Sequence, residues 1–424
     1  MVENSRKDGA RSVSKMKQTE IGVIPEDWEV FTVRDLITLL TDYDANGSFS
    51  SVAENVKSYN HPEYAWYVRS TDLENKTDLS NVKYVDKPSY DFLKKTSLFG
   101  GELLFLKRGD IGNVYLFEMK TNRATLAPNL YLLKLNDISS SKYLYQYFIS
   151  ENGQKQLKSK NAGSTLGALY KDDVKAMLVP LPSLAEQEAI ATALSDADAW
   201  IESLEQLIAK KRLIKQGAMQ ELLTPPSTGN ADGEALEPWE VKKLGEVVNF
   251  KNGAAHENVV DENGEYVIVN SKFISQEGRV RKHSNAFLCP LYKHEITMVM
   301  SDIPNGKALA KCFIIDKDDT YTLNQRICAF EAKEGFDSKY LYYKINRNDY
   351  FLAFDSGSGQ TNLRRDDVLS CPIDFPSLSE QERIATILSD MDAELEALEK
   401  QLGKAQQIKQ GMMQELLTGR IRLV

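Results

Sequence analysis

Residues 183–224 read SLAEQEAIATALSDADAWIESLEQLIAKKRLIKQGAMQELLT, and residues 377–418 read SLSEQERIATILSDMDAELEALEKQLGKAQQIKQGMMQELLT. The two stretches align without a gap, and about two thirds of their positions are identical. A self-match of this length indicates one structural unit that the chain uses twice.

Each copy predicts one long helix. Ser183 and Ser377 stand where N-caps belong, and Glu186 and Glu380 follow three residues later, which is the spacing of a capping box. Gly419 is placed to end the second helix as a left-handed cap. At about 1.5 Å per residue, each helix would be roughly 60 Å long.

Apolar residues in both copies alternate at steps of four and three, the a/d pattern of a helix that pairs with another helix. Since both helices need cover and lie in one chain, we expect them to form an antiparallel coiled coil with each other. The phase then shifts to Ile214 in the first copy and Ile408 in the second. The predicted seam is Ile190, Leu194, Ile201, Leu204, Ile208, Ile384, Leu388, Leu395, Leu398 and Leu402.

The composition is that of a globular protein without a membrane span. The chain has 424 residues with 42% hydrophobic content and no run of about 18 apolar residues, so we expect a cytoplasmic protein. Four cysteines and four histidines follow no metal-binding pattern, so no metal site is predicted.

The net charge of −9 conceals an uneven distribution. The two repeats contain 15 acidic and 8 basic residues, a net charge of −7, which leaves −2 for the rest of the chain. The remaining regions can therefore carry basic faces, although an acidic scaffold that binds no DNA is the alternative interpretation.

The duplication extends beyond the helices. Trp-Glu-Val occurs at residues 28–30 and again at 239–241, so both halves open alike. We predict an arm at 1–18, globular regions at 19–182 and 239–376, helices at 183–224 and 377–424 with its tail, and a linker at 225–238. Each globular region mixes short strands with helices, which indicates an α+β domain with a strongly bent sheet.

The globular regions diverge except for shared islands. The sequence GDIGN at 109–113 resembles SDIPNG at 301–306, and GSTLGALYKDDV at 163–174 resembles GSGQTNLRRDDV at 357–368. Two similar units on paired helices would form a pseudo-two-fold molecule with one unit at each end. Such a molecule could bind two different half-sites about one turn of B-DNA, roughly 34 Å, apart.

From about Thr19 onward, the chain resembles the specificity subunit of a Type I restriction-modification system. The resemblance lies in the paired Trp-Glu-Val openings, the helix starts at 182–196 and 376–390, and the helix ends at 214–224 and 408–418. It implies two target recognition domains that each bind one half of a split asymmetric DNA site. It also implies that the helices act as a spacer and dock two methyltransferase subunits, which motor-nuclease subunits join for restriction.

The resemblance further implies that this subunit is not catalytic and binds no cofactor. S-adenosylmethionine, and ATP and Mg²⁺ for restriction, would be used by the partner subunits. The sequence agrees with this, since it contains neither an Asn-Pro-Pro-Phe methylation motif nor a phosphate-binding Gly-x-x-x-x-Gly-Lys-[Ser/Thr] loop.

Candidate DNA-contacting residues are the polar and basic residues of the islands and of the basic clusters, because such side chains bind phosphates and base edges. In the first region they are Lys107, Arg108, Asn113, Lys155, Lys158, Lys160, Ser164, Thr165, Tyr170 and Lys171. In the second they are Asn270, Lys272, Arg279, Arg281, Lys282, Ser358, Gln360, Thr361, Asn362, Arg364 and Arg365. Ordinary solvated strand ends, turns and hairpin tips are the alternative for each.

Overall fold

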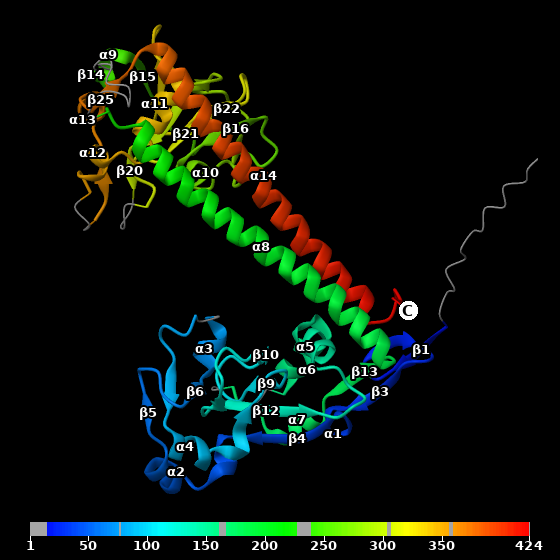
Figure 1. Ribbon diagram of the computed structural model, residues 1–424. Coiled ribbons are helices and arrows are strands. Elements are labelled where there is room, and N and C mark those ends of the chain that lie inside the picture. Colours follow the sequence, from blue (N-terminus) through cyan, green and yellow to red (C-terminus); the bar gives the residue numbers. More distant parts are fainter. Residues whose placement is uncertain are drawn as a thin grey trace, which may run out of the picture. The chain divides into compact units, whose positions relative to one another are not determined.

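The computed structural model describes residues 15–75, 78–160, 167–226, 239–302, 307–355 and 359–423. The chain divides into two compact units. Unit 1 comprises Met1–Leu204 and Gln401–Val424, and unit 2 comprises Glu205–Lys400. Each unit therefore contains the start of one long helix and the end of the other (Figure 1). Within the described residues, no helix combines the length and apolar character needed to cross a membrane.

Both 42-residue repeats form long helices, as predicted. They are α8 (Leu184–Leu222) and α14 (Leu378–Leu416), each 39 residues long. Gly419 ends α14 with a positive φ of 68°. The amide of Gly419 donates to the carbonyl of Leu416 and that of Arg420 to the carbonyl of Glu415, which is a Schellman motif. The predicted left-handed cap is thus confirmed.

The predicted capping boxes are wrong: the glutamate half forms in neither copy, and in the second copy the Glu380 amide donates to the Ser377 carbonyl while Ser377 Oγ contacts Ser379 Oγ. The amide of Glu186 donates to Ser183 Oγ at 3.3 Å, but the Glu186 carboxylate accepts hydrogen bonds from Trp28 and Arg422 instead of from its own N-cap. Glu380 likewise binds Arg383, one turn further along α14. Tertiary partners in the first copy, and a partner within the same helix in the second, thus replace the bond that the spacing predicted.

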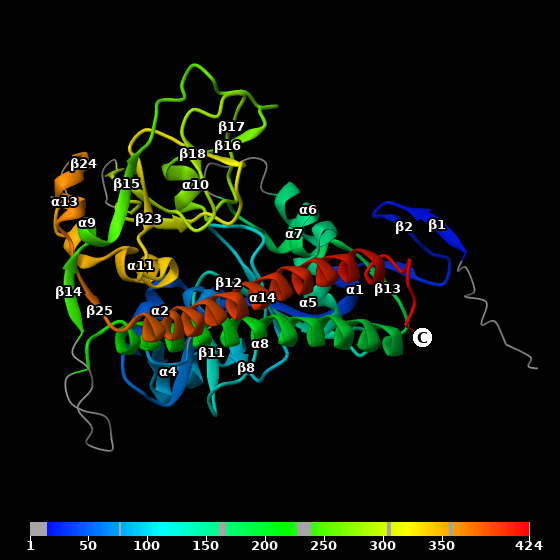
Figure 2. The same cartoon turned by 90° about the horizontal axis from the view of Figure 1, so that it is seen from above.

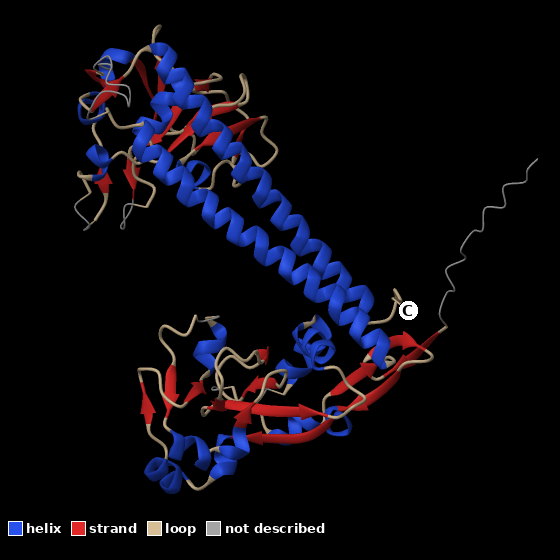
Figure 3. Ribbon diagram, in the orientation of Figure 1, coloured by secondary structure: helices blue, strands red, loops and turns tan. Residues whose placement is uncertain are grey.

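Unit 1 contains two main sheets where one bent sheet was expected. Their hydrogen-bonded orders are β10-β9-β12-β4 and β5-β7-β6-β11-β8, and β13 pairs separately with β3. The strands, red in Figure 3, are β3 (Glu29–Thr32), β4 (Ile37–Asp42), β5 (Ser58–Tyr59), β6 (Ala65–Val68), β7 (Lys83–Val85), β8 (Ser97–Leu98), β9 (Leu103–Leu106), β10 (Val114–Leu116), β11 (Ala124–Leu126), β12 (Leu130–Leu135) and β13 (Leu178–Leu181).

Short helices connect these strands. They are α1 (Val33–Leu36), η1 (Tyr43–Asn46), α2 (Phe49–Asn55), α3 (Ser70–Glu74), α4 (Lys87–Phe92), η2 (Lys94–Thr96), α5 (Ser141–Ile149), α6 (Glu151–Ser159) and α7 (Lys171–Lys175). The expected arm at 1–18 is too long, because β1 (Met16–Thr19) pairs with β2 (Gly22–Pro25) in an antiparallel hairpin.

Unit 2 repeats most of this topology, but its second sheet has four strands where that of unit 1 has five. Its sheets have the orders β15-β23-β19-β21 and β17-β16-β22-β18, with β14 paired to β25 and β20 to β24. Its strands are β14 (Glu240–Lys243), β15 (Val248–Asn252), β16 (Tyr266–Val269), β17 (His283–Ser284), β18 (Pro290–Leu291), β19 (Ile296–Val299), β20 (Ser301–Asp302), β21 (Cys312–Ile314), β22 (Tyr321–Leu323), β23 (Ile327–Ala332), β24 (Thr361–Asn362) and β25 (Pro372–Phe375). Its short helices are α9 (Leu244–Val247), α10 (Ser271–Ser275), α11 (Ser338–Ile345), α12 (Asp349–Leu352) and α13 (Arg365–Leu369).

The central strands are buried on both faces. In β9, Leu103 and Phe105 pack in one hydrophobic cluster, while Leu104 and Leu106 pack in another on the opposite face. This explains the continuous apolar run in that part of the sequence. The first of these clusters also contains Ile190 of α8, so the start of the long helix is part of the unit's core.

A repeated glutamine fixes each long helix to its own unit. Gln187 accepts from the amide of Ser140 at 2.8 Å and donates to the carbonyls of Ile138 and Pro182, both at 3.0 Å. Gln381 repeats this, accepting from the amide of Asp337 and donating to the carbonyl of Pro376. Both glutamines are buried, and their bonds orient the start of each long helix.

The predicted seam positions differ in burial. Ile190, Leu194, Leu204, Ile208, Ile384 and Leu388 are buried, and Ile201, Leu395, Leu398 and Leu402 are half-buried. The predicted phase shift is wrong at its first position, because Ile214 and Ile408 are 46% and 43% exposed. The helical packing therefore does not follow the apolar pattern through that turn.

Contacts between parts of the two long helices occur inside each unit. In unit 1, Lys409 of α14 pairs with Asp198 of α8. In unit 2, ion pairs connect Lys211 with Glu394, Arg212 with Glu399, and Lys215 with Asp392.

Candidate nucleic-acid interface

The structure brings the two predicted islands of unit 1 together. Arg108 forms an isolated antiparallel bridge with Ala168, the amide of Gly109 donates to the carbonyl of Gly167 at 3.1 Å, and the amide of Leu169 donates to Lys107 at 2.9 Å. The segment that leaves β9 therefore lies beside the segment that enters α7.

Unit 2 builds the same pair from different residues. β20 pairs with β24 through Ser301 and Asn362, and the amide of Leu363 donates to the carbonyl of Met300 at 2.7 Å. Gln360 also donates to Ser301 Oγ at 2.8 Å. The sequence suggested the islands one by one, and only the structure shows that each pair forms one surface, which we call the paired loops (residues 107–113 with 167–171, and 300–302 with 359–365).

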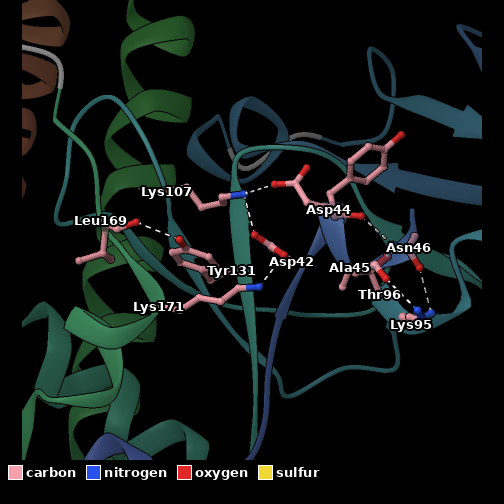
Figure 4. Close-up of polar contacts among 11 residues, drawn as sticks. Asp42, Asp44, Ala45, Asn46, Lys95, Thr96, Lys107, Tyr131, Leu169 and Lys171 are labelled. Carbon is pink, nitrogen blue, oxygen red and sulfur yellow. Dashed lines mark hydrogen bonds and ion pairs between the residues drawn. The ribbon is translucent and has the colours of Figure 1, made fainter. Parts of the chain in front are cut away.

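In unit 1 the two lysines of the paired loops share one carboxylate, as Figure 4 shows. Lys107 Nζ donates to Asp42 Oδ2 at 2.7 Å and Lys171 Nζ to Asp42 Oδ1 at 2.8 Å. Lys107 also donates to Asp44 at 2.8 Å, and its ammonium lies 5.3 Å from the centre of the Tyr131 ring. The cluster thus combines two cations with two carboxylates.

Burial and charge act in opposite directions on this cluster. Burial alone would raise the pKa of Asp42, but hydrogen bonds from Lys107 and Lys171 outweigh it and lower that pKa. Burial would lower the pKa of Lys107, yet bonds to Asp42 and Asp44 raise it. Lys107 is therefore a structural cation with only 14% of its side chain exposed. Lys171, at 38% exposure, keeps part of its surface toward solvent.

Neither Asp42 nor Tyr131 was among the predicted site residues. Asp42 ends the strand β4 and Tyr131 lies within the strand β12. No local sequence pattern links either residue to the islands at 109–113 and 163–174. Tyr131 also donates its hydroxyl to the carbonyl of Leu169 at 3.0 Å, so it supports the second loop of the pair directly.

The cognate cation in unit 2 is placed differently. Arg365, the first residue of α13, lies 5.5 Å over the ring of Phe250 and is exposed. Arg364 is the N-cap residue, and its amide donates to Asp367 at 2.9 Å while its side chain is exposed. Asn362 and Gln360 are exposed, whereas Thr361 is buried and donates to Asp355 at 3.0 Å. Unit 2 thus presents two exposed guanidinium groups where unit 1 presents Tyr170 and Lys171.

The remaining candidates fall into four groups, of which the last lies around α10. Exposed near the paired loops are Arg108 and Tyr170, the latter 68% exposed, with Asn113 half-buried. On α6 and just after it, Lys155, Lys158 and Lys160 are exposed, and Lys155 pairs with Glu151 at 2.7 Å. Ser164, Thr165 and Ser358 lie outside the described residues.

The candidates around α10 have protein partners. Asn270 is the N-cap of α10 and accepts from the amide of Phe273 at 2.9 Å. Arg279 pairs with Glu277 at 3.3 Å and with Glu399 at 3.8 Å, and Arg281 donates to the carbonyl of Gly278. Lys272 and Lys282 are exposed. Asn270, Arg279 and Arg281 thus have partners within the protein, although Arg279 is 71% exposed, and none of these candidates belongs to the paired loops.

Comparison with known proteins identifies the family. Residues 25–211 and 236–410 match the family described as Type I restriction modification DNA specificity domain, so the chain belongs to that family. Among named relatives, a putative type I restriction enzyme MjaX specificity subunit of Methanocaldococcus jannaschii is 26% identical, with 96% of each chain covered. The MjaVIII specificity subunit of the same organism is 25% identical over 94% of each chain.

Solved structures agree on the fold. The chain resembles the crystal structure of a Type I restriction-modification S subunit from M. genitalium with a TM-score of 0.59 and 18% identity. This match covers 92% of this chain and 96% of the other. The resemblance in fold thus extends over both units.

Proposed function

We propose that this chain is the DNA sequence-recognition subunit of a Type I restriction-modification complex. Each unit would bind one half of a split asymmetric DNA site. The observation that carries this proposal is the paired loops, which occupy the same topological place in both units and differ in their side chains. A protein that recognises two different half-sites needs such a constant backbone framework with variable contact residues.

The predicted DNA-contacting residues are ranked by this geometry. Arg364, Arg365, Gln360 and Asn362 in unit 2 are exposed on the paired loops and are suited to phosphates or base edges. In unit 1, Arg108, Tyr170 and the exposed part of Lys171 hold the equivalent places. The α6 lysines are suited to phosphates, and the residues around α10 stay lower-ranked candidates.

We further propose that α8 and α14 form one antiparallel coiled coil that spaces the two units in a pseudo-two-fold molecule. The support is local: in unit 2, residue numbers rise along α8 while those of their ion-pair partners fall along α14, from Lys211 with Glu394 to Lys215 with Asp392. In unit 1, the ion pair of Lys409 with Asp198 likewise connects the two helices.

The partners proposed are double-stranded DNA, two methyltransferase subunits docked on the helices, and motor-nuclease subunits in the full complex, all in the cytoplasm and none in a membrane. One solved structure with a similar fold, at a TM-score of 0.53 and 13% identity, is described as showing complex assembly and conformational transition of the type I R-M system. S-adenosylmethionine, ATP and Mg²⁺ would be bound by the partner subunits. The chain would not be catalytic alone.

Sequencing the methylated bases of a host with and without this gene tests the proposal. We expect loss of methylation at one split motif when the gene is deleted. An unchanged methylome would contradict DNA recognition and favour the alternative of a scaffold that binds no DNA.

A further inference from the structure

We infer that Arg422 is a positioning residue for unit 1. It anchors the C-terminal tail (residues 418–423) to the buried carboxylate of Glu186 and so fixes the start of α8 against the N-terminal segment of the chain. The inference rests on the proposed function where it concerns DNA, and on geometry alone where it concerns unit 1. Figures 1 and 2 both show the C-terminus beside the start of α8.

Glu186 lies at the centre of this anchor. Its side chain is fully buried, and its carboxylate accepts from Arg422 Nη2 at 2.7 Å and from Trp28 Nε1 at 3.1 Å. Arg422 also binds Asp27 with both terminal nitrogens, at 2.9 and 2.8 Å, and lies over the Trp28 ring at 5.8 Å. One guanidinium thus connects the chain end, the start of α8 and the segment before β3.

A buried carboxylate is stable only when it is paired. Removing its cation leaves an unpaired charge inside the protein, which costs more than the pair itself contributes. Trp28 can supply only one hydrogen bond, and its indole nitrogen carries no charge. Glu186 therefore depends on a guanidinium that arrives from the far end of the chain, 236 residues away.

The cognate glutamate in unit 2 does not depend on a tail. Glu380 is paired with Arg383 of its own helix by two hydrogen bonds of 2.7 Å. Position 189, which corresponds to 383 in the repeat alignment, is Ala189, so the first repeat lacks this local partner. The first repeat also ends in Thr224-Pro225-Pro226 where the second continues with Gly419-Arg420-Ile421-Arg422.

The residues before Arg422 hold the tail in place. Leu416 and Leu417 are buried in the core cluster of unit 1 together with Trp28 and Ile24. At Gly419 a Cβ atom would lie 2.4 Å from the ring of Pro25, so the backbone passes the N-terminal segment at close range. The tail is thus a structural part of unit 1, although it is last in the sequence.

This arrangement predicts a selective effect on recognition. Because the tail contacts only unit 1 residues in these interactions, loss of Arg422 should impair the half-site that unit 1 binds and spare the other. Sequence position alone would place the tail with the second half of the chain and predict the opposite.

The experiment compares Arg422→Ala with Arg420→Ala in the full-length chain within its complex. Arg420 is the control, because it lies in the same tail but is exposed. It binds Glu415 in the last turn of α14 and Thr418 just after the helix. Hydrogen exchange is measured separately for peptides of unit 1 (16–32 and 184–194) and unit 2 (240–252). We expect at least tenfold faster exchange in the unit 1 peptides of Arg422→Ala alone.

A second readout concerns DNA. Binding is measured by competition with DNA duplexes in which one half or the other of the methylated motif is scrambled. Replacing residues 28–176 by the matching region of another specificity subunit shows which half unit 1 binds. For Arg422→Ala, scrambling that half should change affinity less than about threefold, while scrambling the other half keeps its full effect.

Further variants guard against a merely unfolded protein. Arg422→Lys keeps the positive charge but cannot bind two carboxylates at once as the planar guanidinium does. The hydrogen-exchange rate of its unit 1 peptides should therefore lie between those of wild type and Arg422→Ala. The double variant Glu186→Gln/Arg422→Ala should exchange its amide hydrogens more slowly than Arg422→Ala, because no buried charge is left unpaired.

Equal hydrogen exchange in Arg422→Ala and wild type, or equal acceleration in both units, would overturn the anchoring. Selective exchange together with wild-type discrimination at both half-sites would overturn its role in recognition. Indifference of the wild-type complex to both scrambled halves would instead contradict the proposed function.

Discussion

Lys171 donates to Asp42 at 2.8 Å, although the two residues are 129 positions apart in the chain. This bond joins the last strand residue of β4 to the first turn of α7, and it ties the second paired loop of unit 1 to the sheet. Since Lys107 occupies the other oxygen of the same carboxylate, Asp42 organises the whole loop pair.

Asp42→Asn should loosen this organisation. We expect unit 1 to lose about 1–3 kcal/mol of unfolding free energy, because two ammonium groups lose their shared carboxylate. Asp91→Asn is the matched control: its ion pair with Lys87 is exposed on both sides, so its loss should leave the unfolding free energy almost unchanged. Urea unfolding measures both, and equal losses would contradict the role of Asp42.

The same carboxylate predicts a pH dependence. The pKa of Asp42 is lower in the folded protein than in the unfolded chain. Its contribution is therefore complete above the ordinary carboxyl pKa of about 4 and is lost as the pH falls through the lower folded pKa. Wild type and Asp42→Asn should thus converge in stability at the acid end of a pH series of unfolding curves, and a constant difference down to pH 2 would contradict this.

Replacing Arg364 and Arg365 by Ala should weaken DNA binding and flatten its salt dependence. Each lost phosphate contact lowers the slope of log affinity against log salt by about one. Lys400→Ala, at an exposed position of α14 in the same unit, is the control and should leave the slope unchanged. A double arginine variant with the wild-type slope would show that these residues do not contact phosphates.

Gly419→Ala should destabilise unit 1 by about 2–3 kcal/mol, because Ala disfavours a φ of 68° and its Cβ would clash with Pro25. Gly403→Ala within α14 meets open space and should instead stabilise the protein by about 0.5–1 kcal/mol. Thermal unfolding of both variants tests whether their changes in stability have opposite signs. If α14 were intolerant of any substitution, both variants would be destabilised.

Exchanging residues 28–176 for the matching region of another specificity subunit should change one half of the methylated motif only. The physical reason is that the two sheets of unit 1 are built from strands within that range, so the exchange replaces most of one core. Methylome sequencing reads the outcome, and a change in both halves would refute independent recognition by the two units.

Deleting seven residues from α8 should shift the tolerated gap between the half-sites or abolish assembly. A heptad is the smallest deletion that keeps a/d positions aligned with a paired helix. The methylated motif and the mass of the complex are the measurements. An unchanged gap in an intact complex would show that the helices do not set the spacing.

The sequence alone was sufficient for the features that repeat. The long helices and the Gly419 cap followed from periodicity and from cap residues, because these depend on neighbours within a few positions. The duplication also pointed to the family, since a long self-match in a fixed order is specific information.

The tertiary structure decided where the polar side chains find partners. Glu186 had the spacing of a capping residue, yet it binds Trp28 and Arg422. Lys107 was a candidate DNA contact, with a solvated strand end as the alternative, yet it binds Asp42 and Asp44. The strength of an ion pair depends on distance and burial in three dimensions, and a one-dimensional pattern contains neither. Local chemistry thus determined the elements of this protein, and packing between distant segments determined which charges remain free to act.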